Sequence, residues 1–494
     1  MEDTEPLSEL IHSLSKADKR FFSLFADREK GDKIYLQLYN DLKNKNPDRN
    51  VSSHQLPDLK KYLYKLLLSS LHTQYAETTI DFKLYKLLHL AGVLLYKGLY
   101  AQTHTLIRKA KKLAYLHERI SLIPELLYLE TFVSNVYGNS SRGENNTLEQ
   151  IHATQILLNL FQYRNLNYQF LSQIRKSNTS RTANQKRVLK KIMQHPLLVK
   201  KNTLSIMAEY SFYTTWGLYH SVHNDLKNMK IILSLQLNLV ESHPKKFENK
   251  ELTHFQTLHN LFLCQMKLKN FKDASTYVEK IKKIKAPSEL VRNVLFLNAY
   301  NNELELLIQS GQFENALPLL NIQESKFMKA SAEQKIMIYG NTAYIYFATA
   351  HFREALQWIM KIVNSPGNDA REDIQSSIRI MYLIVRFEIA SSDSVLKNIA
   401  RSTRYFLEKR NTMFRTEKLI VDFFYKTLKE YLTKKEFIRE LKKVRQELLN
   451  IFQKYPDEKI TQDSFDVLSW INSKIENKSF AELVRARVAT TSTK

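Results

Sequence analysis

A short fragment recurs in the second half of this chain: an aromatic residue, two further residues, a small residue and then an apolar helical run. It reads Phe271-Lys-Asp-Ala274, Phe313-Glu-Asn-Ala316 and Phe352-Arg-Glu-Ala355. Each copy follows a helical stretch, and two of them are introduced by a short turn, at 310–312 and 349–351. Repetition on this scale is typical of stacked helix pairs, because a single pair cannot bury its apolar face alone. The fragment therefore predicts a helical-repeat scaffold.

The scarcity of glycine and proline points to the same fold class. The chain has 9 Gly and 10 Pro in 494 residues, whereas average usage is about 7% and 5%. β-rich folds need these residues at their many turns. Leu, Lys, Glu, Gln and Ala are plentiful, and they are strong helix formers. We therefore predict an all-α chain, an α-solenoid with flanking helical modules.

The recurring fragment also suggests how each helix pair packs. A small residue lets the two helices approach closely, and the aromatic residue before it fills the gap at the corner. This packing needs no ligand. The expected repeat-packing positions are Tyr100, Phe271, Ala274, Phe313, Ala316, Tyr346, Phe352 and Ala355.

Four regions are expected along the chain. They are a small N-terminal helical module (1–78), the helical repeats (79–366), further C-terminal helical repeats or a cap (367–480), and a frayed tail (481–494). Ser15, followed three residues later by Asp18, is predicted to cap a helix. Residues 138–146 are rich in Asn, Ser and Gly and are predicted to form a loop. Whether residues 142–200 continue the stack or interrupt it is left open by the sequence.

The clearest repeat carries a small residue, an aromatic residue, an alanine and a proline in the order Ala343, Tyr346, Ala355 and Pro366. This resembles the tetratricopeptide repeat, whose consensus has these residue types at its eighth, eleventh and twentieth positions and near its end. The copies lie roughly 40 residues apart, against 34 in that family, and the consensus Trp and Gly are mostly absent. The chain thus resembles a tetratricopeptide-like protein with longer helices or loops.

The chain as a whole also resembles an uncharacterised set of tetratricopeptide-like proteins from Bacteroidetes-type bacteria. The segments that carry this resemblance are 10–21 and 401–407. The resemblance implies no known activity.

A strongly basic balance favours an acidic partner. The formal net charge is +24, from 74 Lys and Arg against 50 Asp and Glu. Such an excess suits an acidic protein or nucleic acid, although the basic residues are spread over most helices and could serve solubility alone. The alternative to a protein partner is a nucleic acid whose phosphates meet basic helices. The candidate polyanion contacts are Lys60, Lys61, Lys65, Arg401 and Arg404.

The sequence carries no recognisable catalytic or cofactor motif. It has no glycine-rich phosphate loop, no Gly-x-Ser-x-Gly and no His-Glu-x-x-His. His220 and His223, with Asp225 nearby, lack a third ligand at a meaningful spacing. The one cysteine, Cys264, lies in an apolar run and suits a packing role. We therefore expect no catalytic residue, no metal and no cofactor.

No apolar stretch approaches the length of a membrane span, and the acidic start is no signal peptide. These features predict a cytoplasmic protein with no membrane partner. The function that the sequence favours is a non-enzymatic scaffold with a basic surface, which binds a protein or peptide by shape and charge complementarity, and the excess of positive charge favours an acidic partner. Partner identity, pathway and oligomeric state are not encoded in any motif that we recognise.

Overall fold

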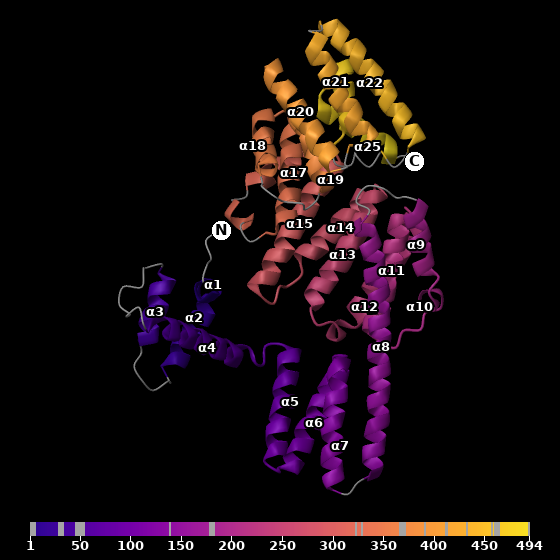
Figure 1. The fold of residues 1–494 in the computed structure, drawn as a ribbon. Helices are drawn as coiled ribbons and strands as arrows, with labels where there is room; N and C mark the ends of the chain where they lie inside the picture. The colour runs from indigo at the N-terminus through magenta and orange to yellow at the C-terminus, as the bar shows by residue number, and fades with distance from the viewer. Residues whose placement is uncertain are drawn as a thin grey trace. The chain divides into compact units, whose positions relative to one another are not determined.

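The computed structural model describes the chain as helices joined by turns, with no strand among the described residues (Figure 1). The all-α prediction is therefore confirmed.

The chain divides into two units: an N-terminal unit of residues 1–159 with 245–248, and a C-terminal unit of residues 160–244 with 249–494. The boundaries predicted at 78 and 366 stay predictions. The described residues are 6–27, 34–44, 55–137, 140–176, 183–321, 324–327, 330–364, 372–389, 392–410, 413–430, 433–455, 458 and 465–492.

The first helices of the N-terminal unit enclose a small core of their own. Ser15 caps α2 as predicted: Asp18 N donates to Ser15 Oγ at 3.1 Å, and Ser15 N donates to the Asp18 carboxylate at 2.8 Å. The same carboxylate accepts from Gln74 Nε2 at 3.0 Å and from Tyr75 Oη at 2.8 Å. One buried aspartate thus starts α2 and attaches it to the end of α4. The helices are α1 (Pro6–Ser13), α2 (Lys16–Ala26), α3 (Ile34–Lys43) and α4 (Leu56–Tyr75).

A second group of helices in this unit shares an apolar core and an ion network. Buried Glu130 accepts from Lys111 Nζ at 3.0 Å and from Arg142 Nη2 at 3.0 Å, and Lys111 also reaches Glu149 at 2.9 Å. Burial opposes ionisation of Glu130, but its bonds to Lys111 and Arg142 hold its pKa below the ordinary value. The network joins α6, α7 and α8. The group comprises α5 (Ile80–Tyr96), α6 (Tyr100–Leu116), α7 (Ile123–Val136) and the first part of α8 (Ser140–Lys176).

The prediction of a loop at 138–146 is wrong from residue 140 onward, because α8 begins at Ser140 and runs for 37 residues. Tertiary contacts override the local preference. Gly143 lies so close to α7 that a Cβ there would come within 3.3 Å of Asn135 Oδ1, and Asn146 is buried. The described part of residues 142–200 consists of α8, which runs to Lys176, and of the helices α9 (Ala183–Met193) and α10 (Pro196–Val199).

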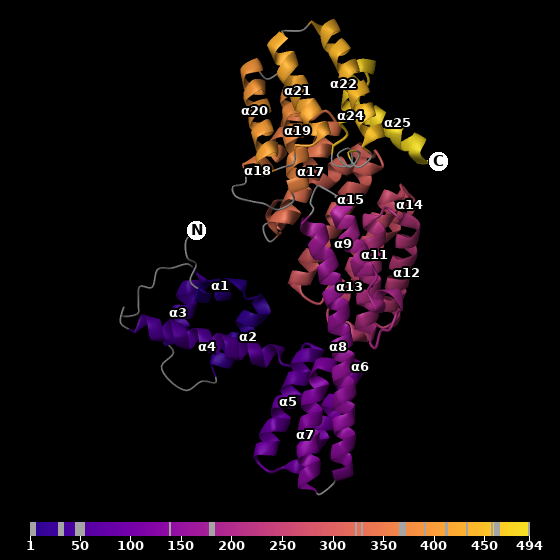
Figure 2. The same ribbon diagram turned by 45° about the vertical axis from the view of Figure 1, so that its right-hand side comes forward.

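In the C-terminal unit consecutive helices pack against each other, which is the arrangement expected of tetratricopeptide-like repeats (Figure 2). The first helices of successive pairs also contact each other: α13 contacts α15, and α15 contacts α17. The helices are α9 (Ala183–Met193), α10 (Pro196–Val199), α11 (Ile206–Val222), α12 (Leu226–Ser242), α13 (Lys250–Lys267), α14 (Phe271–Lys282), α15 (Glu289–Gln309), α16 (Phe313–Ala316), α17 (Ala332–Ala348), α18 (Phe352–Val363), α19 (Glu372–Glu388), α20 (Asp393–Lys409), α21 (Arg415–Glu430), α22 (Lys434–Lys454), α24 (Val467–Glu476) and α25 (Phe480–Ser492).

One backbone geometry recurs at the bends between paired helices, and we call it the left-handed bend. A residue with positive φ follows the first helix, and the next residue donates its N–H to a carbonyl five positions back. At Gly311 (φ 73°) the bond runs from Gln312 N to Leu307 O at 2.8 Å. At Ala350 (φ 61°) it runs from His351 N to Tyr346 O at 2.8 Å. This closure satisfies carbonyls that the helix end leaves without a partner. The other left-handed bends between the helices of a pair lie at Gly98, Asn224 and Lys269, and the same backbone geometry also occurs at Glu118 after α6 and at Asn477 after α24.

Apart from Tyr346, which precedes the bend at Ala350, the predicted packing residues follow these bends at fixed offsets. The aromatic residue is the first residue of the second helix, and the small residue comes three positions later. Ala274, Ala316 and Ala355 are completely buried, as is Phe313. The remaining aromatic residues, Phe271, Phe352, Tyr346 and Tyr100, are half-buried and pack against the cores of their own units. Pro366, which the resemblance placed at the end of the best repeat, lies outside the described residues.

The structure describes a helix, α25, over Phe480–Ser492, where the sequence predicted a frayed tail from residue 481 onward. Helix α25 buries Phe480 and Val484 in the core of the C-terminal unit. Arg485 Nε donates to Gly311 O at 3.0 Å, and the same guanidinium pairs with Glu314 at the start of α16. A Cβ at Gly311 would come within 3.0 Å of Arg485 Cγ. The polar, small composition of this segment concealed the few apolar residues that anchor it.

Replacing Ala350 by glycine is expected to stabilise the C-terminal unit by about 1 kcal/mol, because a Cβ is disfavoured at positive φ. The shift in the midpoint of denaturant-induced unfolding measures this. Ala101→Gly is the matched control: Ala101 is exposed within α6, so glycine there should lower stability by up to about 1 kcal/mol. A destabilising Ala350→Gly variant would contradict the left-handed bend.

Candidate functional site

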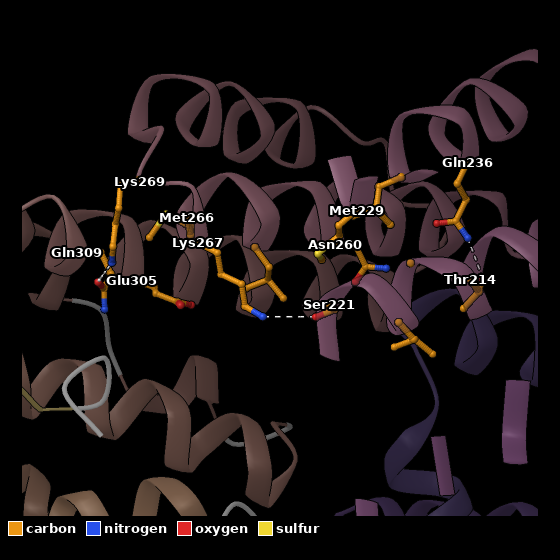
Figure 3. Close-up of a pocket in the computed structure, with 14 residues that line it drawn as sticks. Thr214, Ser221, Met229, Gln236, Asn260, Met266, Lys267, Lys269, Glu305 and Gln309 are labelled. Carbon is orange, nitrogen blue, oxygen red and sulfur yellow. Dashed lines mark hydrogen bonds between the residues drawn. The ribbon is translucent and has the colours of Figure 1, made fainter. Parts of the chain in front are cut away.

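A groove of about 340 Å³ opens along α11, α13 and α15, the first helices of three successive pairs (Figure 3). We call it the α11–α15 groove. All of its lining residues belong to the C-terminal unit. The lining includes Thr214, Leu218 and Ser221 of α11, Met229, Leu233 and Gln236 of α12, Asn260, Leu263, Met266 and Lys267 of α13, Lys269, and Glu305 and Gln309 of α15.

The left-handed bends determine which positions face the groove. Counted back from the left-handed residue, the sixth position is Leu218 in α11, Leu263 in α13 and Glu305 in α15. The same position in α17 is Tyr344, whose ring lies 5.9 Å from that of Phe480 in α25. The C-terminal helices thus cover the equivalent surface of α17. The surface of α11, α13 and α15 is left open, and this fixes the extent of the groove.

The floor of the groove combines apolar side chains with one incompletely bonded amide. Gln236 is buried, and its Nε2 donates to Thr214 Oγ1 at 2.7 Å and to Tyr210 O at 3.3 Å. Its Oε1 is buried and accepts no hydrogen bond within the described part of the chain. A buried acceptor in this state is costly unless a water or a ligand donates to it. Gln236 therefore offers an acceptor beside Met229 and Leu233.

Charged side chains of both signs line the groove near α15. Lys267 Nζ donates to Ser221 Oγ at 3.4 Å, which spans from α13 to α11. Lys269 Nζ donates to Gln309 Oε1 at 3.2 Å, which connects the α13 bend to α15 (Figure 3). Glu305 lies between these contacts in the view of Figure 3. A groove with an apolar floor and polar groups of fixed geometry suits recognition of an extended or helical chain segment.

The polyanion contacts proposed from the sequence belong to two different units. Lys60, Lys61 and Lys65 lie on α4 of the N-terminal unit, where Lys61 and Lys65 are exposed. Arg401 and Arg404 lie on α20 of the C-terminal unit. Arg404 is ion-paired with Asp422 of α21 and lies over the Tyr425 ring. Its charge is thus used within the fold.

The histidine pair singled out in the sequence takes part in local hydrogen bonds. His220 Nδ1 lies 2.9 Å from Asp225 Oδ2, and His223 Nδ1 lies 2.9 Å from Tyr219 O. Within the described residues, no three His, Cys, Asp or Glu side chains are grouped so as to hold a metal ion. Cys264 is buried, its Sγ lies 3.6 Å from Leu226 O, and burial raises its pKa. The histidine contacts are thus local to α11 and the bend after it, and the Cys264 contact joins α13 to α12.

Glu417, near the start of α21, is a buried carboxyl group of the C-terminal unit. Burial, together with the nearby charge of Glu458, raises its pKa to about 7. Glu458 accepts from Thr416 Oγ1 at 3.0 Å, whereas Glu417 Oε2 is buried without a hydrogen-bond partner in the described residues. Perturbed carboxyl pairs are characteristic of acid–base sites. Neither residue lines the α11–α15 groove, and we assign the pair to the stability of α21.

None of the described helices combines the length and the apolar character that crossing a bilayer would require.

Comparison with known proteins identifies one structure with a similar fold and no family. No family model matches the chain, and neither does any curated protein. Among solved structures, the crystal structure of the apo form of RapI is similar at 15% sequence identity, over 73% of this chain and 99% of that one, with a TM-score of 0.42. We base no functional argument on this likeness.

Glu417→Gln is expected to stabilise the protein at pH 8 by roughly 1–3 kcal/mol, since it removes a carboxylate that is buried when ionised. The unfolded chain ionises Glu417 near its ordinary pKa, below the folded value of about 7. The contribution of Glu417 to the free energy of unfolding of the wild type is therefore greatest at low pH, and it falls as the pH rises toward 7. The advantage of the variant should vanish near pH 4. Denaturant midpoints from pH 4 to 8 measure it, and an equal effect at both ends would contradict the assignment.

Proposed function

We propose that this chain is a non-enzymatic scaffold that holds a protein or peptide partner in the α11–α15 groove. The observation that carries the proposal is the groove itself. Equivalent positions of three successive first helices point into one hollow, and the next equivalent position is already covered by α25. Helical-repeat proteins present such surfaces for extended partners. A cytoplasmic location and kinship with Bacteroidetes-type proteins belong to the same proposal and rest on the sequence alone.

The chemistry of the lining suggests what part of a partner would be held. Leu218, Leu263 and Met266 offer apolar contact. Gln236 offers a buried acceptor for an N–H group, and Asn260 lies on the same wall as Leu263. Lys267 and Lys269 add positive charge, so an acidic segment fits better than a basic one. We therefore propose a partner segment that alternates apolar and acidic residues.

A nucleic-acid function through α4 and α20 is not carried forward, because no described contact favours it. Its candidate residues belong to two units, and Arg404 is paired with Asp422. Polyanion binding through dispersed lysines would depend steeply on salt.

Peptides selected from a displayed library against the full chain are expected to be rich in acidic and apolar residues. Lys267→Glu should weaken the best of them by about tenfold or more, because it places a like charge against the acidic segment. Lys272→Glu is the matched control: Lys272 is exposed on α14 and does not line the groove. It should leave affinity within about twofold, as surface charges away from a contact do. Equal effects of both variants, or no selected peptide, would overturn the proposal.

A further inference from the structure

A second hollow in the C-terminal unit is distinct from the groove and has four lysines in its lining. It has a volume of about 520 Å³ and shares no lining residue with the α11–α15 groove. Four lysines from three segments converge on it: Lys250 at the start of α13, Lys280 near the end of α14, and Lys283 and Lys285 beyond it. We call it the lysine pocket. Its volume lies within the range of about 300–1,000 Å³ that is typical of small-ligand sites.

Both carboxylates of the lysine pocket lie against other side chains of the pocket itself. Glu241 Oε1 lies 3.2 Å from His254 Nε2, and Glu251 Oε1 lies 3.6 Å from Lys250 Nζ. In the described part of the chain, Lys280, Lys283 and Lys285 have no carboxylate at ion-pair distance. The pocket therefore holds an excess of positive charge that the protein itself does not neutralise.

Helix electrostatics explains only part of this arrangement. Lysines in the last turn of a helix are stabilised by its dipole, which accounts for Lys280 and for Lys283 at the end of α14. Lys250 occupies the first turn of α13, where the dipole opposes a cation, and the N-cap Asn249 makes no side-chain capping bond. Lys285 lies outside any helix. Bringing these charges to one hollow is unfavourable in the free protein, and an anion would relieve it.

We propose that the lysine pocket binds a small ligand that carries two or more phosphate groups. Several phosphates match several ammonium groups, each of which acts as a point charge with three donors. The buried Val240 and the half-buried Ile284 give the pocket an apolar wall, against which a non-phosphate part of such a ligand can pack. The site is independent of the peptide proposal, because the two hollows share no residue.

Isothermal titration of the full chain with sodium tripolyphosphate tests this assignment. One binding site per chain is expected in buffer of physiological ionic strength. The double variant Lys283→Gln/Lys285→Gln should lower the affinity by about tenfold or more, since it removes two unpaired ammonium groups from the pocket. The control is Lys227→Gln/Lys272→Gln, which removes the same charge from exposed positions outside the pocket. It should change the affinity by no more than about twofold, because only distant charge is lost.

The melting temperature of each variant without ligand shows whether it folds, and exposed lysine substitutions should leave it nearly unchanged. Tripolyphosphate should raise the melting temperature of the wild type and of the control, and not that of the double variant. The proposal is overturned if tripolyphosphate does not bind, or if both double variants lose affinity equally. It is also overturned if a single-stranded oligonucleotide binds while tripolyphosphate does not, since the lysines would then serve a polynucleotide surface.

Discussion

The left-handed bend is the feature on which the rest of the C-terminal unit depends. A single residue with positive φ, followed by an N–H that returns to a carbonyl of the preceding helix, reverses the chain within a few residues. The reversal fixes the offset between the paired helices, so that at the bends before Phe271, Phe313 and Phe352 an aromatic ring meets the corner and an alanine meets the facing helix. Ala274, Ala316 and Ala355 are completely buried for this reason. Glycine, asparagine, lysine and alanine all occupy the left-handed position, which shows that closure and packing outweigh the strain of a Cβ there.

The same geometry positions the candidate site and sets its limit. Because each bend has the same offsets, equivalent residues of α11, α13 and α15 face one hollow. In α17 the equivalent position is Tyr344, which packs against Phe465 and Phe480 from the last part of the chain. Arg485 of α25 reaches the bend at Gly311. The C-terminal helices therefore complete a core at one end and leave the groove open at the other.

The sequence was most informative where aromatic and small residues mark the bends, and least where packing replaces them. The helix pairs around Phe271, Phe313 and Phe352 could be predicted because ring and methyl group recur at one spacing. The bend at Asn224 has the same backbone geometry, but Leu226 and Met229 stand in place of the aromatic and small residues, so no pattern reveals it. The groove was not predictable residue by residue, since inward-facing positions follow from the bend and not from residue type. The lysine pocket combines segments whose proximity only the fold creates.

The most direct test of the account is amide hydrogen exchange of the residues that close the bends. The amides of Asp225, Asn270, Gln312 and His351 donate to carbonyls of the preceding helices. They are expected to exchange slowly, together with the helix interiors, because they open only when the pair itself opens. Exchange as fast as that of a solvated turn at these four amides would show that the bends are not closed, and would contradict the common geometry on which the stack and the groove are built.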